Sequence, residues 1–173
     1  MAGEAGAGSL GERPSEKEEK NAPHPRCGDV RSGLAMSSDR SKIAGARKLD
    51  LASTFAVLDS DHLATLVDVT PTIYEELDER FDRFKGRLLV SCYGFESDWP
   101  TWERHPAGDE IVCLLSGNAR MVLDRDGVEE VIHLRDPGSY IVVPKGTWHT
   151  ARTSVATKML FITPGEGTEN RPI

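Results

Sequence analysis

Residues 102–153 decide the fold of this chain, because two clusters of metal-binding residue types there bracket a series of short strands and turns. The first cluster reads WERHPAGDE at 102–110 and continues as the apolar run IVCLLSG to residue 117. The second cluster reads GSYIVVPKGTWH at 138–149. Everything before about residue 50 has a different composition, so the domain is expected to be built around these two clusters.

The chain from residue 87 onward reads as short strands separated by tight turns. Runs of β-branched and apolar residues alternate with Gly, Pro, Asn and Asp, which is typical of antiparallel barrels and jelly rolls. The predicted fold class is therefore all-β, with the barrel spanning 87–173. Strands are expected at 88–92, 111–115, 120–123, 131–134, 140–143 and 159–163, with turns at 116–118, 124–127, 136–138 and 144–146.

Residues 48–86 predict an N-terminal hairpin and one short helix that pack on the barrel. The β-branched runs at 54–58 and 64–69 flank a polar turn and predict the hairpin. Residues 1–47, by contrast, contain almost no large apolar side chains, and such a segment cannot bury enough surface to offset its chain entropy. They are predicted to be a disordered tail, with translation from Met36 as an alternative.

The predicted helix is amphipathic and begins near Pro71. Proline is favoured in the first turn of a helix, and Thr72 with Glu75 predicts a capping box. A stripe of apolar side chains along one face predicts that the helix lies against a sheet. The stripe comprises Ile73, Leu77, Phe81 and Phe84.

The charge distribution argues against nucleic-acid and membrane partners. The net charge is −7, and residues 1–47 hold seven acidic and eight basic side chains, so the remainder carries −8. An acidic domain without a basic face is a poor partner for phosphate backbones or anionic lipid. No apolar run approaches the roughly 20 residues that span a bilayer.

The cysteines and the N-terminus predict a cytoplasmic protein. Cys27, Cys92 and Cys113 are odd in number and share no close spacing, so neither a disulfide framework nor a cysteine zinc site is expected. The N-terminal residues lack the apolar segment of a signal peptide and are too acidic for a transit peptide.

Several predicted strands are apolar on both faces, as in the run at 111–115. One face can line the barrel interior, and the other must be covered by the N-terminal hairpin and helix or by a second subunit. A homodimer is therefore the expected assembly.

Four side chains are candidate metal ligands. Glu103 and His105 are two residues apart and project from the same face of a strand. A turn after His105 could bring Glu110 back beside it, and His149 follows the turn at 144–146. Imidazole and carboxylate donors suit Fe(II), Mn(II), Ni(II), Zn(II) or Co(II).

The two clusters resemble the two motifs of the cupin superfamily. The second motif, Gly-x5-Pro-x-Gly-x2-His-x3-Asn, is matched by four residues, with Thr153 in place of Asn. The first motif, Gly-x5-His-x-His-x3–4-Glu-x6-Gly, is matched by three, with Ser97 and Glu103 in place of the opening Gly and the first His. The matching residues are Gly138, Pro144, Gly146 and His149, and then His105, Glu110 and Gly117. The chain resembles a single-domain cupin of the conserved-barrel type over residues 87–163.

The resemblance implies a β-barrel that holds a metal through the motif positions Glu103, His105, Glu110 and His149. Two carboxylates and two neutral imidazoles would formally neutralise a divalent ion. Relative to a site of three histidines, that should raise the pKa of bound water and favour the higher oxidation state of iron. Fe(II) or Mn(II) is the favoured cofactor, with Ni(II), Zn(II) or Co(II) as alternatives.

The expected function is a metal-dependent enzyme acting on a small molecule, most readily an oxidoreductase of the dioxygenase kind. A metal-dependent isomerase, lyase or hydrolase, a sugar-binding cupin, and a non-catalytic cupin that binds a metal or metabolite remain alternatives. Candidate substrate-binding side chains are Tyr93, Arg120 and Tyr140. Trp99, Trp102 and Trp148 could wall the pocket or serve packing and subunit contacts.

Overall fold

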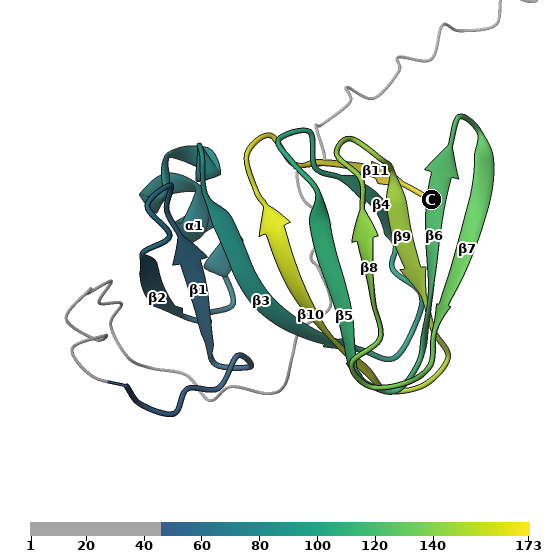
Figure 1. Ribbon diagram of the computed structural model, residues 1–173, viewed down its shortest axis with the longest axis horizontal. Helices are drawn as coiled ribbons and strands as arrows, with labels where there is room; N and C mark the ends of the chain where they lie inside the picture. The colour runs from purple at the N-terminus through teal and green to yellow at the C-terminus, as the bar shows by residue number, and fades with distance from the viewer. Residues whose placement is uncertain (1–45) are drawn as a thin grey trace, which may run out of the picture.

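The computed structural model describes residues 46–173, which form a two-sheet β-barrel with a smaller lobe beside it (Figure 1). The predicted tail at 1–47 and the alternative start at Met36 lie outside the described residues, apart from residues 46 and 47. No helix within the described part is long and apolar enough to cross a membrane.

The barrel is built from two antiparallel sheets, and the predicted all-β cupin-type jelly roll is confirmed. Sheet A has the order β2-β1-β3-β10-β5-β8, and sheet B has the order β11-β4-β9-β6-β7. Sheet A comprises β1 (Thr54–Leu58), β2 (Ala64–Asp68), β3 (Leu88–Phe95), β5 (Glu110–Ser116), β8 (Tyr140–Val143) and β10 (Thr157–Pro164). Sheet B comprises β4 (Thr101–Arg104), β6 (Ala119–Arg125), β7 (Val128–Leu134), β9 (His149–Arg152) and β11 (Glu169–Pro172).

The N-terminal helix differs from its predicted form at both ends. Helix α1 spans Ile73–Arg80, and its N-cap residue Thr72 makes no side-chain cap hydrogen bond. The Thr72 hydroxyl instead donates to a carboxylate oxygen of Glu76 at 2.7 Å, so the predicted capping box does not form. At the other end, a 3₁₀ turn at Asp82–Phe84 has positive φ angles. The apolar stripe is therefore broken before Phe84, although that ring is still buried.

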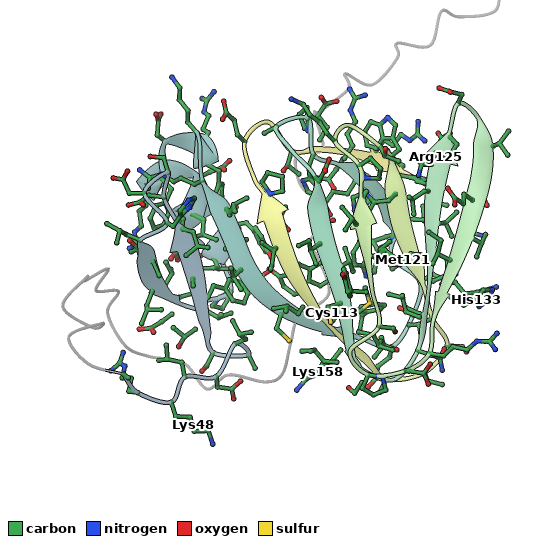
Figure 2. The ribbon with its side chains drawn as sticks, in the orientation of Figure 1. Lys48, Cys113, Met121, Arg125, His133 and Lys158 are labelled. Carbon is green, nitrogen blue, oxygen red and sulfur yellow. The ribbon has the colours of Figure 1, made fainter. Side chains whose placement is uncertain are left out.

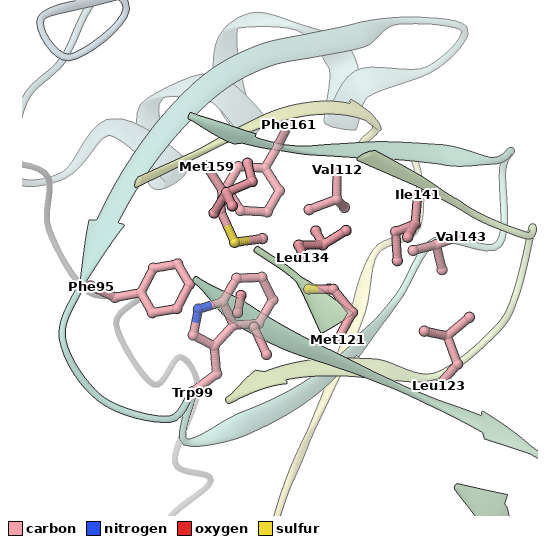
Figure 3. Close-up of a cluster of buried hydrophobic side chains, with 13 residues drawn as sticks. Phe95, Trp99, Val112, Met121, Leu123, Leu134, Ile141, Val143, Met159 and Phe161 are labelled. Carbon is pink, nitrogen blue, oxygen red and sulfur yellow. The ribbon is translucent and has the colours of Figure 1, made fainter. Parts of the chain in front are cut away.

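The core consists of two apolar clusters, and both contact the inner face of sheet A. The larger fills the space between the two sheets (Figure 3) and includes Met121, Leu123 and Phe161. The smaller packs α1 against β1 and β3. Tyr93 contacts both clusters, which joins the N-terminal lobe to the barrel.

Gly117 occupies the tight turn between β5 and β6, and its replacement by alanine is expected to destabilise the barrel. Its φ is +80°, and an added Cβ would overlap the Ala156 carbonyl oxygen. Backbone strain and this overlap together should lower the free energy of unfolding by about 2–4 kcal/mol, measurable by urea denaturation.

Gly127→Ala is the matched control for Gly117→Ala. Gly127 has φ +86°, and nothing lies within 4 Å of the position that an alanine methyl group would occupy, so only the backbone strain of about 1 kcal/mol applies. Equal losses in the two variants would show that the close approach to Ala156 contributes nothing.

Candidate metal centre

Glu103, His105, Glu110 and His149 meet at one end of the barrel interior. Glu103 lies in β4 and His105 directly follows that strand, while Glu110 opens β5 and His149 opens β9. The β4–β9 register places Glu103 opposite His149. The structure therefore brings all four predicted side chains together.

Two hydrogen bonds join the loops that carry the two motifs. The Gly146 N–H donates to the His105 carbonyl oxygen at 3.0 Å. The Lys145 N–H donates to the Asp109 carboxylate at 2.8 Å. The 144–146 turn is thus fixed against the turn after β4, and this contact brings two sequence-distant hairpins to one point.

The donor atoms of the four residues lie close together and are shielded from solvent. His149 Nε2 is 3.0 Å from Glu110 Oε2, and His105 Nε2 is 3.4 Å from Glu110 Oε1. Glu103 Oε1 is 3.9 Å from His105 Nε2. The side chain of Glu103 is 13% exposed, against 3% or less for the other three, so Glu103 lies on the open side of the group.

Both imidazole rings are oriented through their Nδ1 atoms. His149 Nδ1 lies 3.2 Å from the Thr147 carbonyl oxygen, which can only accept, so Nδ1 carries the proton. His105 Nδ1 lies 2.9 Å from Thr168 Oγ1, and that hydroxyl donates its own proton to the Gly165 carbonyl oxygen. His105 Nδ1 is then the donor as well, and each ring turns a bare Nε2 lone pair towards the centre.

The donor set fits a divalent cation. His105 Nε2, His149 Nε2 and Glu110 Oε2 are buried, and they have no hydrogen-bond partner among the described residues. Ligand bonds of 2.0–2.2 Å place neighbouring donors of an octahedral ion about 3 Å apart, which matches the 3.0 and 3.4 Å separations. Lone pairs facing one another at this distance repel unless a cation or a proton lies between them.

The electrostatics of the centre favour a charged carboxylate. Burial of Glu110 by itself favours the neutral form, but His105 and His149 outweigh it and hold the pKa of Glu110 well below its usual range. Burial disfavours the imidazolium of His149, but the Glu110 carboxylate outweighs that effect and raises the pKa of His149. The raised pKa means that, without a metal, His149 holds a proton to higher pH than a free imidazole does.

Sequence reasoning missed the threonines that hold the donors. Thr163 in β10 donates to Glu110 Oε1 at 2.6 Å, and Thr168 orients His105. Neither residue belongs to the two clusters, and threonine is too common a residue for its position alone to be a signal. The Thr147 carbonyl is a backbone group, which no sequence pattern marks.

The outer side of the ligand strands carries a stack of arginine and tryptophan side chains. The Arg104 guanidinium lies 4.7 Å from the centre of the Trp148 ring, and Arg171 lies 4.5 Å from it on β11. Arg171 also lies over Trp102. As predicted, Arg104 and Trp148 face away from the donor cluster. Trp99 packs in the barrel core beside Phe95. Trp99 therefore serves packing in the core, and Trp102 and Trp148 pack against arginines on the outer side.

The three predicted substrate-binding side chains do not lie at the donor cluster. Tyr140 is 61% exposed on β8, and Arg120 is exposed on β6, three residues from the position paired with His149. Tyr93 packs between the two apolar clusters. Side chains alternate between the two faces of a strand, and those of Tyr140 and Arg120 fall on the outer faces of their sheets, which is why neither reaches the donor cluster.

Among curated proteins, the chain is similar to acireductone dioxygenases from two strains of Rhodopseudomonas palustris. Each is 32% identical over 118 residues, covering 63% of this chain and 66% of the relative. The chain thus spans just under two thirds of the length of these relatives. No family model matches the chain.

Among solved structures, the chain is similar to several cupin proteins. A cupin-2 domain protein from Shewanella frigidimarina is 23% identical with a TM-score of 0.37, covering 49% of this chain and 71% of that one. A cupin superfamily protein from Desulfitobacterium hafniense is 26% identical with a TM-score of 0.38, covering 46% and 68%. An oxalate oxidase is 16% identical with a TM-score of 0.41, covering 47% and 44%.

Proposed function

We propose that this chain, whose barrel carries two motifs that resemble those of cupins, is a divalent-metal-dependent oxidoreductase of the dioxygenase kind that acts on a small molecule. The ligands would be Glu103, His105, Glu110 and His149. The observation that carries the proposal is the convergence of buried, unpartnered Nε2 and carboxylate atoms on one point. The similarity to acireductone dioxygenases supports O2 chemistry over the alternatives.

The residues of this chain have separable roles in the proposed reaction. When bound, a redox-active ion would supply Lewis acidity and electron transfer. Thr168 and the Thr147 carbonyl keep both imidazoles in the tautomer that binds metal. The apolar barrel core below the donors excludes water from one side, so access is expected past Glu103, the least buried donor.

The choice of metal follows from the donor set. Two carboxylates and two imidazoles are oxygen and nitrogen donors without thiolate, which suits Fe(II) or Mn(II), and Ni(II), Zn(II) and Co(II) are compatible. The negative charge of two carboxylates would also weaken attraction for an anionic substrate.

Metal analysis combined with an oxygen-consumption assay tests the proposal. The protein would be purified without chelators, analysed for metals, and reloaded with Fe(II), Mn(II) or Ni(II) in the presence of an acireductone and O2. Metal-dependent O2 uptake supports a dioxygenase, and turnover without O2 uptake supports an isomerase or lyase. A bound metal with no turnover in a metabolite screen supports a non-catalytic cupin.

Glu103 is tested separately, because it stands where cupins usually have histidine. Glu103→Ala should lower metal affinity about tenfold or more if the carboxylate is a ligand. Glu96→Ala, which removes an exposed carboxylate remote from the cluster, should leave metal content unchanged. An unchanged metal content in both variants would remove Glu103 from the ligand set.

The contact between Thr168 and His105 predicts a graded effect on metal affinity. Thr168→Val removes the hydroxyl that accepts from His105 Nδ1, and loss of such an orienting partner typically costs 10- to 100-fold in metal affinity. Thr168→Ser keeps the hydroxyl and should restore most of the affinity. Competition titration with a chromophoric chelator measures both, and equal weakening in the two variants would contradict this role.

We also propose a homodimer that forms through the outer face of sheet A. Two rows of uncharged side chains cross four strands of this face, and the described helix α1 packs on the opposite face. The rows are Val90, Ile162, Ile111 and Val142, and Cys92, Leu160, Cys113 and Tyr140. Two rows without a charged side chain suit a second copy of this face better than a charged partner, and Lys158 lies at the end of the face, beside Leu160 on β10.

Light scattering on the full chain tests the dimer. The wild type should show twice the mass of one chain, and Val142→Glu, at the 48% exposed centre of β8, should give the monomer. Val128→Glu, 69% exposed on β7, is the matched control and should remain dimeric. A monomeric wild type would refute the proposal.

The proposed location of the enzyme remains the cytoplasm, as the cysteine pattern predicts.

A further inference from the structure

A pocket of about 410 Å³ opens at the end of the barrel opposite the donor cluster. Strand β9 begins at His149, in the cluster, and ends at Arg152, which lines the pocket. The rest of the wall comes from the β5–β6 turn and from the neighbouring ends of β6 and β7. In Figure 2, the labelled His133 lies towards this end of the β6–β7 hairpin and Arg125 towards the other. The pocket volume is in the range that small ligands occupy.

Basic side chains form one row across the wall of this pocket. The sheet register pairs Arg120 with Arg152 on one side and with His133 on the other. Directly opposed residues have Cβ atoms about 5 Å apart, and like charges placed there are destabilising. Arg135 also lines the pocket and lies 3.5 Å from His133 Nδ1. An acidic protein that places three arginines around one pocket has concentrated its positive charge there.

Acidic side chains of the described residues neutralise only part of this charge. Arg152 pairs with Glu129 at 3.3 Å, where both side chains are substantially exposed. Within residues 46–173, no ion pair joins Arg120 or Arg135 to a carboxylate. Asp136 adjoins Arg135 in the sequence, but its carboxylate makes no ion pair in the described part of the chain. Two guanidinium groups are therefore available to an incoming anion.

The floor of the pocket is held in place by a network of short hydrogen bonds. Thr153 and Thr157 both donate to the Asn118 carbonyl oxygen, at 2.7 and 2.8 Å. The Thr153 N–H donates to the Asp98 carboxylate at 2.9 Å, so this carboxylate is hydrogen-bonded to the backbone. A rigid floor lowers the ordering cost when a ligand binds.

We propose that this pocket binds a small oxyanion, either a phosphate or a compact dicarboxylate, through Arg120, Arg135 and Arg152. The planar guanidinium group matches both oxyanions by paired N–H···O contacts. The site is distinct from the donor cluster, because Arg120 lies three residues along β6 from Leu123, the partner of His149, and on the outer face. Its occupancy does not depend on the proposed oxidoreductase activity.

Calorimetric titration of the metal-loaded full chain with inorganic phosphate and with succinate tests the site. Binding with a dissociation constant near or below about 1 mM at ~0.1 M NaCl is expected for at least one of the two. Arg120→Gln should weaken that binding at least tenfold. Arg125→Gln, which removes an arginine paired with Glu130 at the other end of β6, should leave it unchanged. Comparing the two anions distinguishes the phosphate class from the dicarboxylate class.

Two outcomes would overturn the proposal. The first is the absence of saturable binding of either anion, and the second is equal weakening in Arg120→Gln and Arg125→Gln, which would indicate general surface attraction. Metal content, measured on the same samples, should be identical in all variants. A failure of the metal centre would therefore be seen separately from a failure of the anion pocket.

Discussion

Glu110→Gln is expected to abolish metal binding and, with it, all metal-dependent turnover. Glu110 makes the shortest contacts to the two imidazoles, at 3.4 Å to His105 and 3.0 Å to His149. The amide keeps the size of the side chain but removes its charge, and it can turn an N–H₂ group towards a metal. We expect metal affinity to fall by at least about 100-fold and turnover by at least about 1,000-fold. Elemental analysis and the oxygen-consumption assay measure the two effects.

The control for Glu110→Gln separates loss of metal from loss of fold. Glu130→Gln changes an exposed carboxylate that pairs with Arg125, and it should keep both metal and turnover. Circular dichroism should show the same β-sheet signal in both variants, because the barrel core does not depend on the charge of Glu110. Full metal content in Glu110→Gln would show that the metal binds elsewhere, and it would refute the proposed centre.

Removal of the metal by a chelator is expected to lower the melting temperature, and the gap should widen as pH rises from 6 to 8. At a free metal concentration 100 times the dissociation constant, binding contributes about 2.7 kcal/mol to stability. The pKa of His149 is raised above its ordinary value of 6.5, so at pH values below that raised pKa a metal must displace the proton of His149. Binding therefore strengthens with pH until His149 is neutral without metal.

The metal-free protein should follow the opposite trend over the same pH range. The pKa of His149 is raised on folding, so the stability from its pairing with Glu110 is complete below about pH 6.5 and is lost as pH rises through the folded value. The pKa of Glu110 is lowered, so its contribution is present above its ordinary value of 4.5 and is lost only in stronger acid. Calorimetry with and without chelator checks both trends. A gap that does not change with pH would contradict proton displacement.

The strands that could be predicted are those whose apolar residues face the core. Residues 140–143 match β8 at both ends. Strand β7 begins three residues before its predicted start, because its first residues are the exposed Val128 and two glutamates. Strand β11, with the sequence ENRP, was not predicted at all. It contributes no apolar side chain to the barrel and is held by pairing with β4, which leaves no hydrophobic pattern to detect.

The four donors could be placed together from the sequence because two motifs carry them, and each motif contains its own turn. The side chains proposed for substrate binding could not be placed, because a single register step decides whether a strand residue faces inward or outward. Arg120 illustrates this, since it neighbours Met121 in sequence but lies on the opposite face of β6. The helix end was missed because two of the three residues in the left-handed turn at Asp82–Phe84, Arg83 and Phe84, have no preference for positive φ.

The position of Thr168 has a consequence for the order of events during protein synthesis. The four donors have all been translated by residue 149, but the hydroxyl that orients His105 follows 19 residues later, next to β11. Strand β11 in turn pairs with β4, which carries Glu103. A nascent chain halted on the ribosome before β11 emerges would thus contain all four metal-binding side chains but would lack the contacts that orient them. Cation loading should be a late step, close to or after release of this segment from the exit tunnel.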